Sequence, residues 1–305
     1  MKHQPKHYVE YAFFRSVAFF MQVLPYRAAL AVGWVIAWLG FFVFRFRVVA
    51  ACERIREVMG DDLSDRDVRR IAWRGFRNTC FSAVDLIRVP KMTLAWVKKV
   101  TDYDDAMKFK KALSQKGGVL ALPHMGSWDM GAVALSMFDV PIFIITRRQK
   151  NLLMDAYMNR MRQVTNIEII CRESGALKRI ISNLKKGKVF AITPDVRAKE
   201  DALRVNFLGK EANLARGPVV FARHAKVPVY PGYIVRKGWT RQVWTLGDPV
   251  LPDLKADKRE DAQRMMQELM DQFTVAVRAH PEHYFWYNKR WVLEPLREQA
   301  TDSAT

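Results

Sequence analysis

Residues 118–129 read Gly-Val-Leu-Ala-Leu-Pro-His-Met-Gly-Ser-Trp-Asp, a short apolar run that ends in a proline and then in small and polar residues. The run has the length and composition of a buried strand, and the apolar residues 131–137 after it are typical of a helix. His124 is therefore predicted at the carboxyl end of a strand, which is where ligand crevices open in α/β sheets.

The segments on either side of this stretch predict an α/β fold, in which buried strands alternate with amphipathic helices. Residues 53–110 carry helical periodicity and form a helical lead-in. After residue 117 the pattern changes, and we expect a mixed sheet flanked by helices. The expected strands are 119–122, 142–145, 167–170, 189–192, 227–235 and 243–246, and the expected helices are 151–164, 174–186, 215–225 and 258–279.

The composition indicates one large core with a strongly basic surface. Half of the 305 residues are hydrophobic, and 50 Lys and Arg residues against 31 Asp and Glu residues give a formal net charge of +19. Such a charge attracts polyanions, either nucleic acid or an anionic bilayer. The sequence contains no recognisable nucleic-acid-binding module, and its aromatic residues lie mostly in apolar runs. We therefore expect no nucleic-acid partner.

The three cysteines, Cys52, Cys80 and Cys171, are too few and too scattered for a disulfide framework. They also lack the spacing of a Cys/His metal site. We expect reduced thiols in a cytoplasmic setting.

The N-terminal region favours the bilayer, because residues 28–44 form a run of seventeen residues without a charge. This is at the short end of what spans a membrane, and Pro25 and Arg27 prevent an extension backward. A spanning helix and a helix lying in the interface therefore both fit, and a helix buried in the protein core is the alternative. Arg45 and Arg47 indicate that the C-terminal side of the run is cytoplasmic.

Arg45 and Arg47 also argue against a cleaved signal peptide and against a lipoprotein signal ending at Cys52, because both signals need an uninterrupted apolar region before the cleavage site. We predict a membrane-anchoring segment at residues 1–47, a catalytic domain at residues 48–298 and a disordered tail at residues 299–305.

The polar residues after the strand predict a catalytic base. A tight turn through Gly126 brings the Asp129 carboxylate back to the His124 imidazole, where it fixes the tautomer and stabilises the imidazolium. The imidazole can then deprotonate an alcohol. A bare His-x4-Asp pattern is more often structural, so the context decides. Ser127 offers a covalent alternative with His124 as its base, but Gly-Ser-Trp lacks a nucleophile-elbow pattern.

Five further blocks accompany residues 124–129. They are Thr146-Arg147-Arg148, Asn159-Arg-Met-Arg162, Thr193-Pro194-Asp195, Val205-Asn-Phe-Leu-Gly209 and His280-Pro-Glu-His-Tyr-Phe-Trp286-Tyr-Asn-Lys-Arg290-Trp291. In this order, the blocks resemble the lipid A biosynthesis late acyltransferases, the lauroyl and myristoyl transferases of the lysophospholipid acyltransferase superfamily. The resemblance extends over most of the chain. It implies a glycerol-3-phosphate-acyltransferase-like fold and transfer of a fatty acyl group from a thioester to a lipid hydroxyl.

The resemblance also implies an acceptor and a location. The acceptor would be a lipid A precursor or a related polar lipid, and the protein would sit on the cytoplasmic face of the bacterial inner membrane in lipopolysaccharide biosynthesis. Two departures leave the acceptor open. Asn166 stands where many members have glycine four residues after the match to Arg162, and Arg27 interrupts the first apolar run.

Four residues outside the His124 and Asp129 pair are candidates for substrate binding. The guanidinium of Arg162 can hold a phosphate bidentately, or it can be a solvated charge on a helix. Asp195 ends a strand on the same rim as His124, where it can bind an acceptor hydroxyl or pair with an arginine. Arg147 and Arg148 also follow a strand and can meet phosphate or face the membrane.

The expected partners follow from the resemblance and the charge. They are anionic membrane lipids, a lipid or glycolipid acceptor, and an acyl carrier protein or coenzyme A thioester as donor, with the carrier protein favoured by the resemblance. A thioester needs little help to leave, so we expect no metal and no cofactor beyond the donor substrate. A lipid esterase or thioesterase that activates water with the same pair stays open. A non-catalytic scaffold would leave the polar His/Asp pair unexplained.

Overall fold

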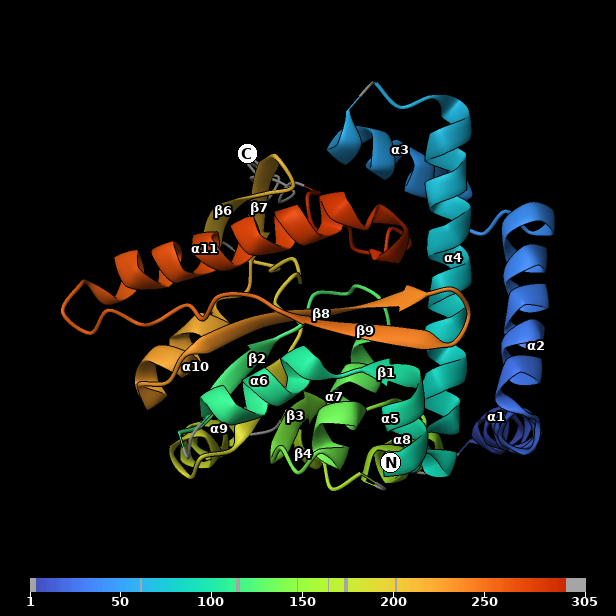
Figure 1. Ribbon diagram of the computed structural model, residues 1–305, viewed down its shortest axis with the longest axis horizontal. Helices are drawn as coiled ribbons and strands as arrows, with labels where there is room; N and C mark the ends of the chain where they lie inside the picture. The colour runs from blue at the N-terminus through green and yellow to red at the C-terminus, as the bar shows by residue number, and fades with distance from the viewer. Residues whose placement is uncertain are drawn as a thin grey trace, which may run out of the picture.

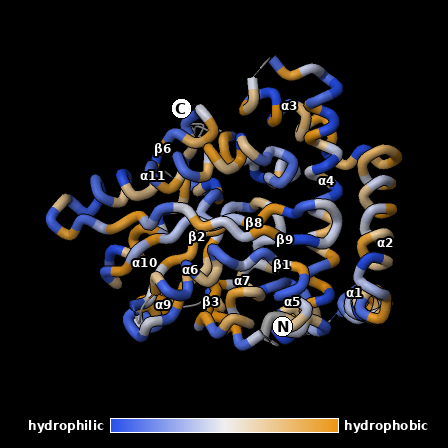
Figure 2. The backbone as a smooth tube through the Cα atoms, in the orientation of Figure 1, coloured by the Kyte–Doolittle hydropathy of each residue, from blue (hydrophilic) through white to orange (hydrophobic). Residues whose placement is uncertain are grey.

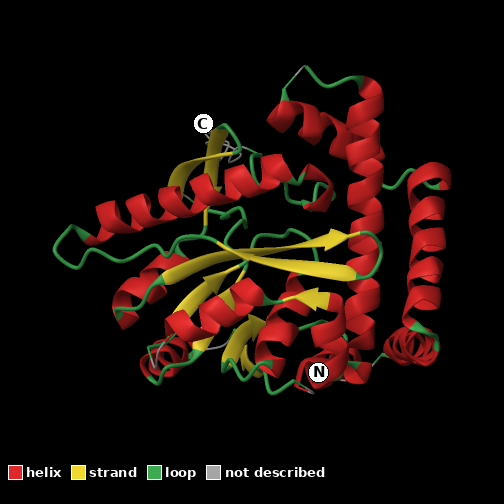
Figure 3. Cartoon of the chain, viewed as in Figure 1, coloured by secondary structure: helices red, strands yellow, loops and turns green. Residues whose placement is uncertain are grey.

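A mixed sheet of seven strands organises the chain (Figures 1 and 3). The computed structural model describes residues 4–60, 62–113, 116–146, 148–163, 165–172, 175–200 and 202–294. The strand order is β1-β9-β8-β2-β5-β3-β4, with β8 and β9 antiparallel and the other neighbours parallel. The strands are β1 (Thr101–Asp102), β2 (Gly118–Ala121), β3 (Ile142–Thr146), β4 (Glu168–Cys171), β5 (Val189–Ile192), β8 (Val229–Lys237) and β9 (Arg241–Leu246). The predicted α/β class and all six predicted strands are confirmed.

The central strand β2 is buried on both faces, which explains its continuous apolar sequence. Because side chains alternate along a strand, Val119 and Ala121 join one core cluster and Leu120 joins the other. Figure 2 shows the apolar colouring of this central region. The first cluster contains side chains of α9 (Ala176–Lys185), α10 (Gly217–Ala225) and α11 (Lys258–Ala279), and the second those of α5 (Leu94–Val100), α6 (Asp104–Leu113) and α7 (Trp128–Met137).

Two short features were not predicted. A separate two-stranded antiparallel sheet pairs β6 (Leu203–Phe207) with β7 (Lys210–Leu214) beside α11, and β1 adds two residues to the edge of the main sheet. The predicted helices are confirmed within a few residues, and α8 (Leu152–Gln163) precedes β4 as expected. Asn166, between α8 and β4, adopts a positive φ of 60°, which asparagine tolerates better than most residues and glycine adopts freely.

The N-terminal helices flank this α/β body. They are α1 (Pro5–Val23), α2 (Tyr26–Trp38) and a π-helical turn η1 (Leu39–Val43), followed by α3 (Val48–Met59) and α4 (Asp65–Arg88). Buried side chains of η1, α3 and α4 belong to the first core cluster of the body. In Figure 1, α2 runs alongside α4 on the outer side of the molecule, and α1 lies across the lower ends of these two helices. The predicted break at Pro25 is confirmed, because this residue is the N-cap of α2.

The helical stretch Tyr26–Val43 is long and apolar enough to cross a membrane, and most of it is not buried in the protein. Large apolar side chains such as Val35, Trp38 and Val43 are exposed on it. These features fit a membrane-associated segment better than a buried core helix. The division at residues 47 and 48 stays a prediction, and the tail at residues 299–305 lies outside the described residues.

Candidate active site

His124 lies in a loop that is held by hydrogen bonds from several directions. Leu122, at the loop's start, donates its backbone N–H to the carbonyl of Ile192, the last residue of the neighbouring strand β5 (2.9 Å). The N–H of Gly126 donates to the carbonyl of His283 (2.8 Å), and the N–H of Phe285 donates to the carbonyl of His124 (2.9 Å). The position of the imidazole is therefore set by backbone contacts as well as by its own side-chain partners.

Gly126 is required by the shape of this loop. Its φ is +61°, and a Cβ at this position would lie 1.6 Å from the carbonyl oxygen of Ile234 on β8. Any larger residue would force the loop away from β8. On the opposite side, the Ser82 hydroxyl of α4 donates to the Gly126 carbonyl (3.1 Å), so the loop is clamped between the sheet and α4.

The imidazole is paired with Asp195. Since β2 and β5 are adjacent parallel strands, the residues that follow them emerge at the same edge of the sheet. The Nδ1 of His124 lies 2.9 Å from Oδ1 of Asp195, and the backbone N–H of His124 donates to Oδ2 of the same carboxylate (2.9 Å). The Tyr284 hydroxyl also donates to Oδ2 (3.2 Å). The Asp195 side chain is 1% exposed and that of His124 is 22% exposed.

This arrangement corrects one prediction. The hydrogen bond to Nδ1 of the imidazole was expected from Asp129, and Asp195 makes it instead. The physical reason is the order of the strands. Asp195 follows β5, which lies beside β2, so its carboxylate emerges next to the His124 loop, whereas Asp129 lies in the first turn of α7. Asp195 lies on the predicted rim, where its carboxylate contacts the imidazole; binding of an acceptor hydroxyl by Asp195 stays a prediction.

The electrostatic surroundings raise the pKa of His124 above its usual value of 6.5. Burial alone would lower this pKa, but the charge of Asp195 and its hydrogen bond raise it, and the charge of Asp129 raises it further. Since the carboxylate accepts the Nδ1 proton, Nε2 carries the lone pair. The ring packs edge-on against Trp128 at 5.2 Å between centroids. With its proton on Nδ1, the neutral ring can accept a further proton at Nε2.

Ser127 is turned away from the imidazole. Its hydroxyl donates to Oδ2 of Asp85 on α4 (3.1 Å), and the residue is 3% exposed. Asp85 is a buried carboxylate that the sequence analysis missed. The guanidinium of Arg236, the side-chain amide of Gln242 (3.1 Å) and the hydroxyl of Tyr26 (2.8 Å) also donate to it. The serine therefore has a structural partner, and the structure gives no support to a serine nucleophile.

The remaining predicted residues are placed only in part. Arg148 is exposed directly beyond β3, which runs parallel to β5, so it lies at the same edge of the sheet as His124. The backbone of Arg162 belongs to α8, but its side chain lies outside the described part of the structure, as does Arg147. Their roles stay predictions.

The C-terminal block completes the site. Met125 and Tyr284 form an antiparallel bridge, so residues 283–285 pair with the His124 loop like a short strand. Burial, followed by the nearby His280 and Arg236, lowers the pKa of His283 to about 3, so its ring is neutral and lies 3.3 Å from the Asn78 amide of α4. The sequence analysis named this block only as part of the resemblance and assigned no residue of it to the site.

In the described ranges, no group of three or more His, Cys, Asp or Glu side chains is arranged to hold a metal ion. The three cysteines are free.

Comparison with known proteins identifies the relatives of this chain. A profile described as bacterial lipid A biosynthesis acyltransferase matches residues 2–292. A phosphatidylinositol mannoside acyltransferase of Mycolicibacterium smegmatis is 21% identical over 227 residues, which cover 72% of this chain and 72% of that protein. The protein of the same name from Mycobacterium tuberculosis is 22% identical over 183 residues, covering 58% of this chain and 55% of that protein.

Proposed function

Because the chain belongs to the bacterial lipid A biosynthesis acyltransferase family, it is an acyltransferase that acts on lipids, and we propose that His124 and Asp195 carry its chemistry. The reaction is transfer of a fatty acyl group from a thioester to a hydroxyl of a polar membrane lipid. The observation that supports this proposal most is the 2.9 Å contact between Nδ1 of His124 and the buried Asp195 carboxylate.

In the proposed mechanism, Nε2 of His124 removes the proton of the acceptor hydroxyl while the oxygen attacks the thioester carbonyl. The tetrahedral intermediate collapses by breaking the carbon–sulfur bond. The imidazolium returns its proton to the departing thiolate, so the products are an ester and a thiol. Asp195 stabilises the imidazolium through the Nδ1 hydrogen bond, and Asp129 adds negative charge from the first turn of α7.

The acceptor we propose is a lipid A precursor or a related polar lipid. The family profile supports the first, and the relatives named for phosphatidylinositol mannoside support the second. We propose an acyl carrier protein as the donor in preference to coenzyme A, because the family resemblance favours it; the net charge of +19 suits both of these anionic donors. The proposed location is the cytoplasmic face of the bacterial inner membrane, with anionic lipids around Tyr26–Val43.

The test measures transfer of a radiolabelled acyl chain from acyl carrier protein or coenzyme A to extracted membrane lipids, with the product identified by mass spectrometry. Wild type should form one acylated lipid, and His124→Ala should lose at least about 10³-fold of the rate. His224→Ala is the matched control, because His224 is an exposed histidine on α10 and should keep full activity. Full activity in His124→Ala would contradict the mechanism.

The same assay separates transfer from hydrolysis. A lipid esterase or thioesterase would release free fatty acid with every acceptor, because water would take the place of the lipid hydroxyl. That outcome would replace the proposed transfer and would leave the role of His124 as a base in place.

A further inference from the structure

An apolar cleft of about 460 Å³ opens between α1, α2 and α4, away from the catalytic loop. Phe20 and Met21 of α1, Val32 and Ile36 of α2, and Ala83 and Val84 of α4 are among its lining residues. The volume is within the range of small-molecule binding sites. Gly33 allows α2 to approach α4 closely, because a Cβ there would lie 2.9 Å from the Val84 side chain.

The wall of the cleft offers almost no polar contact to a ligand. The lining side chains with a hydroxyl or thiol group are those of Ser16 and Cys80. The Ser16 hydroxyl donates to the Ala12 carbonyl within α1 (3.0 Å), so it is satisfied by its own helix. Burial raises the pKa of the Cys80 thiol to about 11, which keeps it uncharged. A ligand that fits this wall must itself be hydrocarbon.

The cleft is separate from the reaction centre. On α4, Asn78, Ser82 and Asp85 bond the catalytic loop and the C-terminal block. Cys80, Ala83 and Val84 project from the other side of the helix, since each residue turns by about 100°. The helix α4 therefore lies between His124 and any ligand held in the cleft.

We propose that this cleft holds one alkyl chain of a bilayer phospholipid as a resident, non-reacting ligand. Phe20 and Ile36 line the cleft and are also 56% and 53% exposed, so its wall continues into the apolar surface of α1 and of the candidate membrane helix. Hydrocarbon that covers this surface has a direct path into the cleft. The inference rests on the proposed membrane attachment of α2 and not on the proposed acyl transfer.

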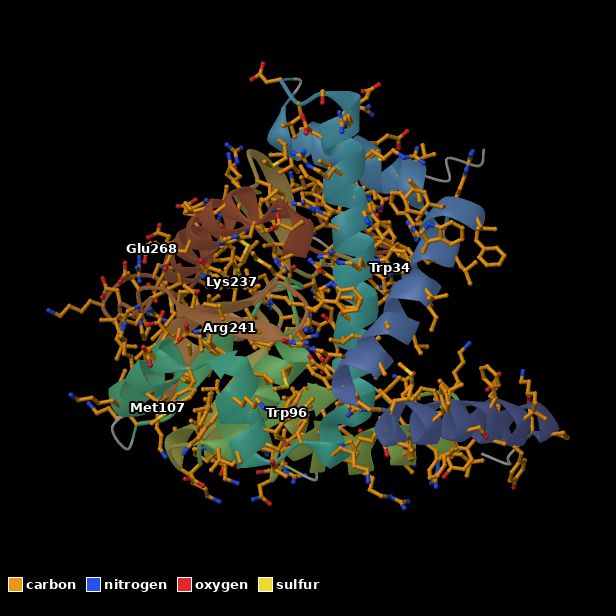
Figure 4. The ribbon with its side chains drawn as sticks, turned by 45° about the vertical axis from the view of Figure 1, so that its right-hand side comes forward. Trp34, Trp96, Met107, Lys237, Arg241 and Glu268 are labelled. Carbon is orange, nitrogen blue, oxygen red and sulfur yellow. The ribbon has the colours of Figure 1, made fainter. Side chains whose placement is uncertain are left out.

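A cation at the edge of the cleft completes the site for a phospholipid. Arg88 ends α4, and its guanidinium donates to the carbonyls of Met21, a lining residue, and Leu24 (2.7 Å for Leu24). The guanidinium also lies 5.8 Å from the centre of the Tyr26 ring. A partly exposed arginine beside an apolar cleft provides charge for the phosphate of the same lipid. Figure 4 shows α1 projecting from the body and Trp34 between α2 and α4.

The test is photolabelling of the full chain in phosphatidylglycerol vesicles that contain phosphatidylglycerol with a mid-chain diazirine, followed by peptide mapping. Wild type should carry label at residues 80–87, because Val84 is 3% exposed and a bilayer chain reaches it through the cleft. Ala83→Trp fills the cleft from α4 and should lower this label about tenfold, a binding difference of ~1.4 kcal/mol. Ser16→Phe fills it from α1 and should do the same.

Val35→Trp is the matched control, since Val35 is 50% exposed on α2 and does not line the cleft. It should leave the label at residues 80–87 unchanged. His124→Ala should also keep the label, which separates this inference from the proposed reaction. Three outcomes overturn it: no label at residues 80–87 in wild type, undiminished label in both filled variants, or loss of label on adding excess acyl thioester, which would make the cleft a donor site.

Discussion

Two buried carboxylates flank the catalytic loop, and they differ in the charge of their partners. Asp195 is bonded to the His124 imidazole, the His124 backbone and the Tyr284 hydroxyl, none of which carries a permanent charge. Asp85 is bonded to Arg236, whose side chain is 2% exposed, and to neutral side chains of Gln242, Ser127 and Tyr26. Each carboxylate fixes a different end of the same loop.

The difference separates chemistry from architecture. Burial lowers the pKa of Arg236, but the charge of Asp85 raises it, and the net shift is upward, so Arg236 keeps its positive charge across the working pH range. The Asp195 charge is balanced only when His124 takes up a proton. Asp195, a buried carboxylate without a permanent counterion among the described side chains, stabilises an imidazolium that forms during the reaction. Asp85, a buried carboxylate paired with an arginine, stabilises the fold.

The largest expected effect is on the Asp195 side. Asp195→Asn keeps the shape of the side chain but removes the negative charge that stabilises the imidazolium, so kcat should fall by roughly 10³-fold or more. The acyl-transfer assay measures it, and circular dichroism checks folding. If kcat falls less than about tenfold, Asp195 is structural like Asp85 and the comparison fails.

For the ion pair of Asp85 and Arg236, we expect that a substitution lowers the stability of the protein. Arg236→Met leaves a buried carboxylate without its cation, which should cost about 3–5 kcal/mol of the free energy of unfolding. Urea unfolding followed by circular dichroism measures this value. Arg241→Met is the control from the same hairpin, because Arg241 pairs with Asp102 at the surface (Figure 4) and should change stability little. Equal losses in both variants would show that burial of the Asp85 pair has no special role.

The pH dependence of the reaction should report the charge around His124. The base form is active, and a raised pKa keeps the proton bound to higher pH, so kcat/KM should rise with pH through an inflection above 6.5. Asp129→Asn removes a smaller raising contribution than Asp195→Asn and should lower the inflection by less. The pH profiles of the two variants measure this order, and the reverse order would return the orienting role to Asp129.

The smallest expected effect belongs to Tyr284→Phe. This change removes one of three hydrogen bonds to Asp195, so the activation free energy should rise by about 1 kcal/mol, with KM unchanged. Steady-state kinetics measure both constants. A loss as large as that of Asp195→Asn would mean that the tyrosine contributes more than support to the carboxylate.

Much of the fold was predictable because it depends on local patterns. The central strands β2 and β5 are continuous apolar runs, and α11 is capped by Asp257 and carries an apolar face, so these elements have strong sequence signals. The β6–β7 hairpin was not predicted. Buried and exposed residues alternate along β6, with Arg204 and Asn206 pointing outward, but a run of five residues is too short to give a clear strand signal.

The partners of the two carboxylates could not be predicted from local patterns. His124 meets Asp195 because β5 lies beside β2, an order that depends on crossover connections. The side chains that bond Asp85 lie between 42 and 157 residues away along the chain. The sequence around Asp85 in α4 gives no sign of these partners. The sequence therefore placed His124 correctly and assigned its hydrogen-bond partner to the nearer acid.

The bridge between Met125 and Tyr284 has a consequence for how the protein is made. During synthesis, the strand before His124 leaves the ribosome long before residues 283–285, which pair with its loop. The N-terminal helices can meet the bilayer first, while the loop still lacks its last strand-like partner and the hydroxyl that supports Asp195. With the membrane attachment proposed above, a nascent chain would meet the bilayer before residues 283–285 complete the His124 loop, and the proposed active site would form in one of the last steps of folding.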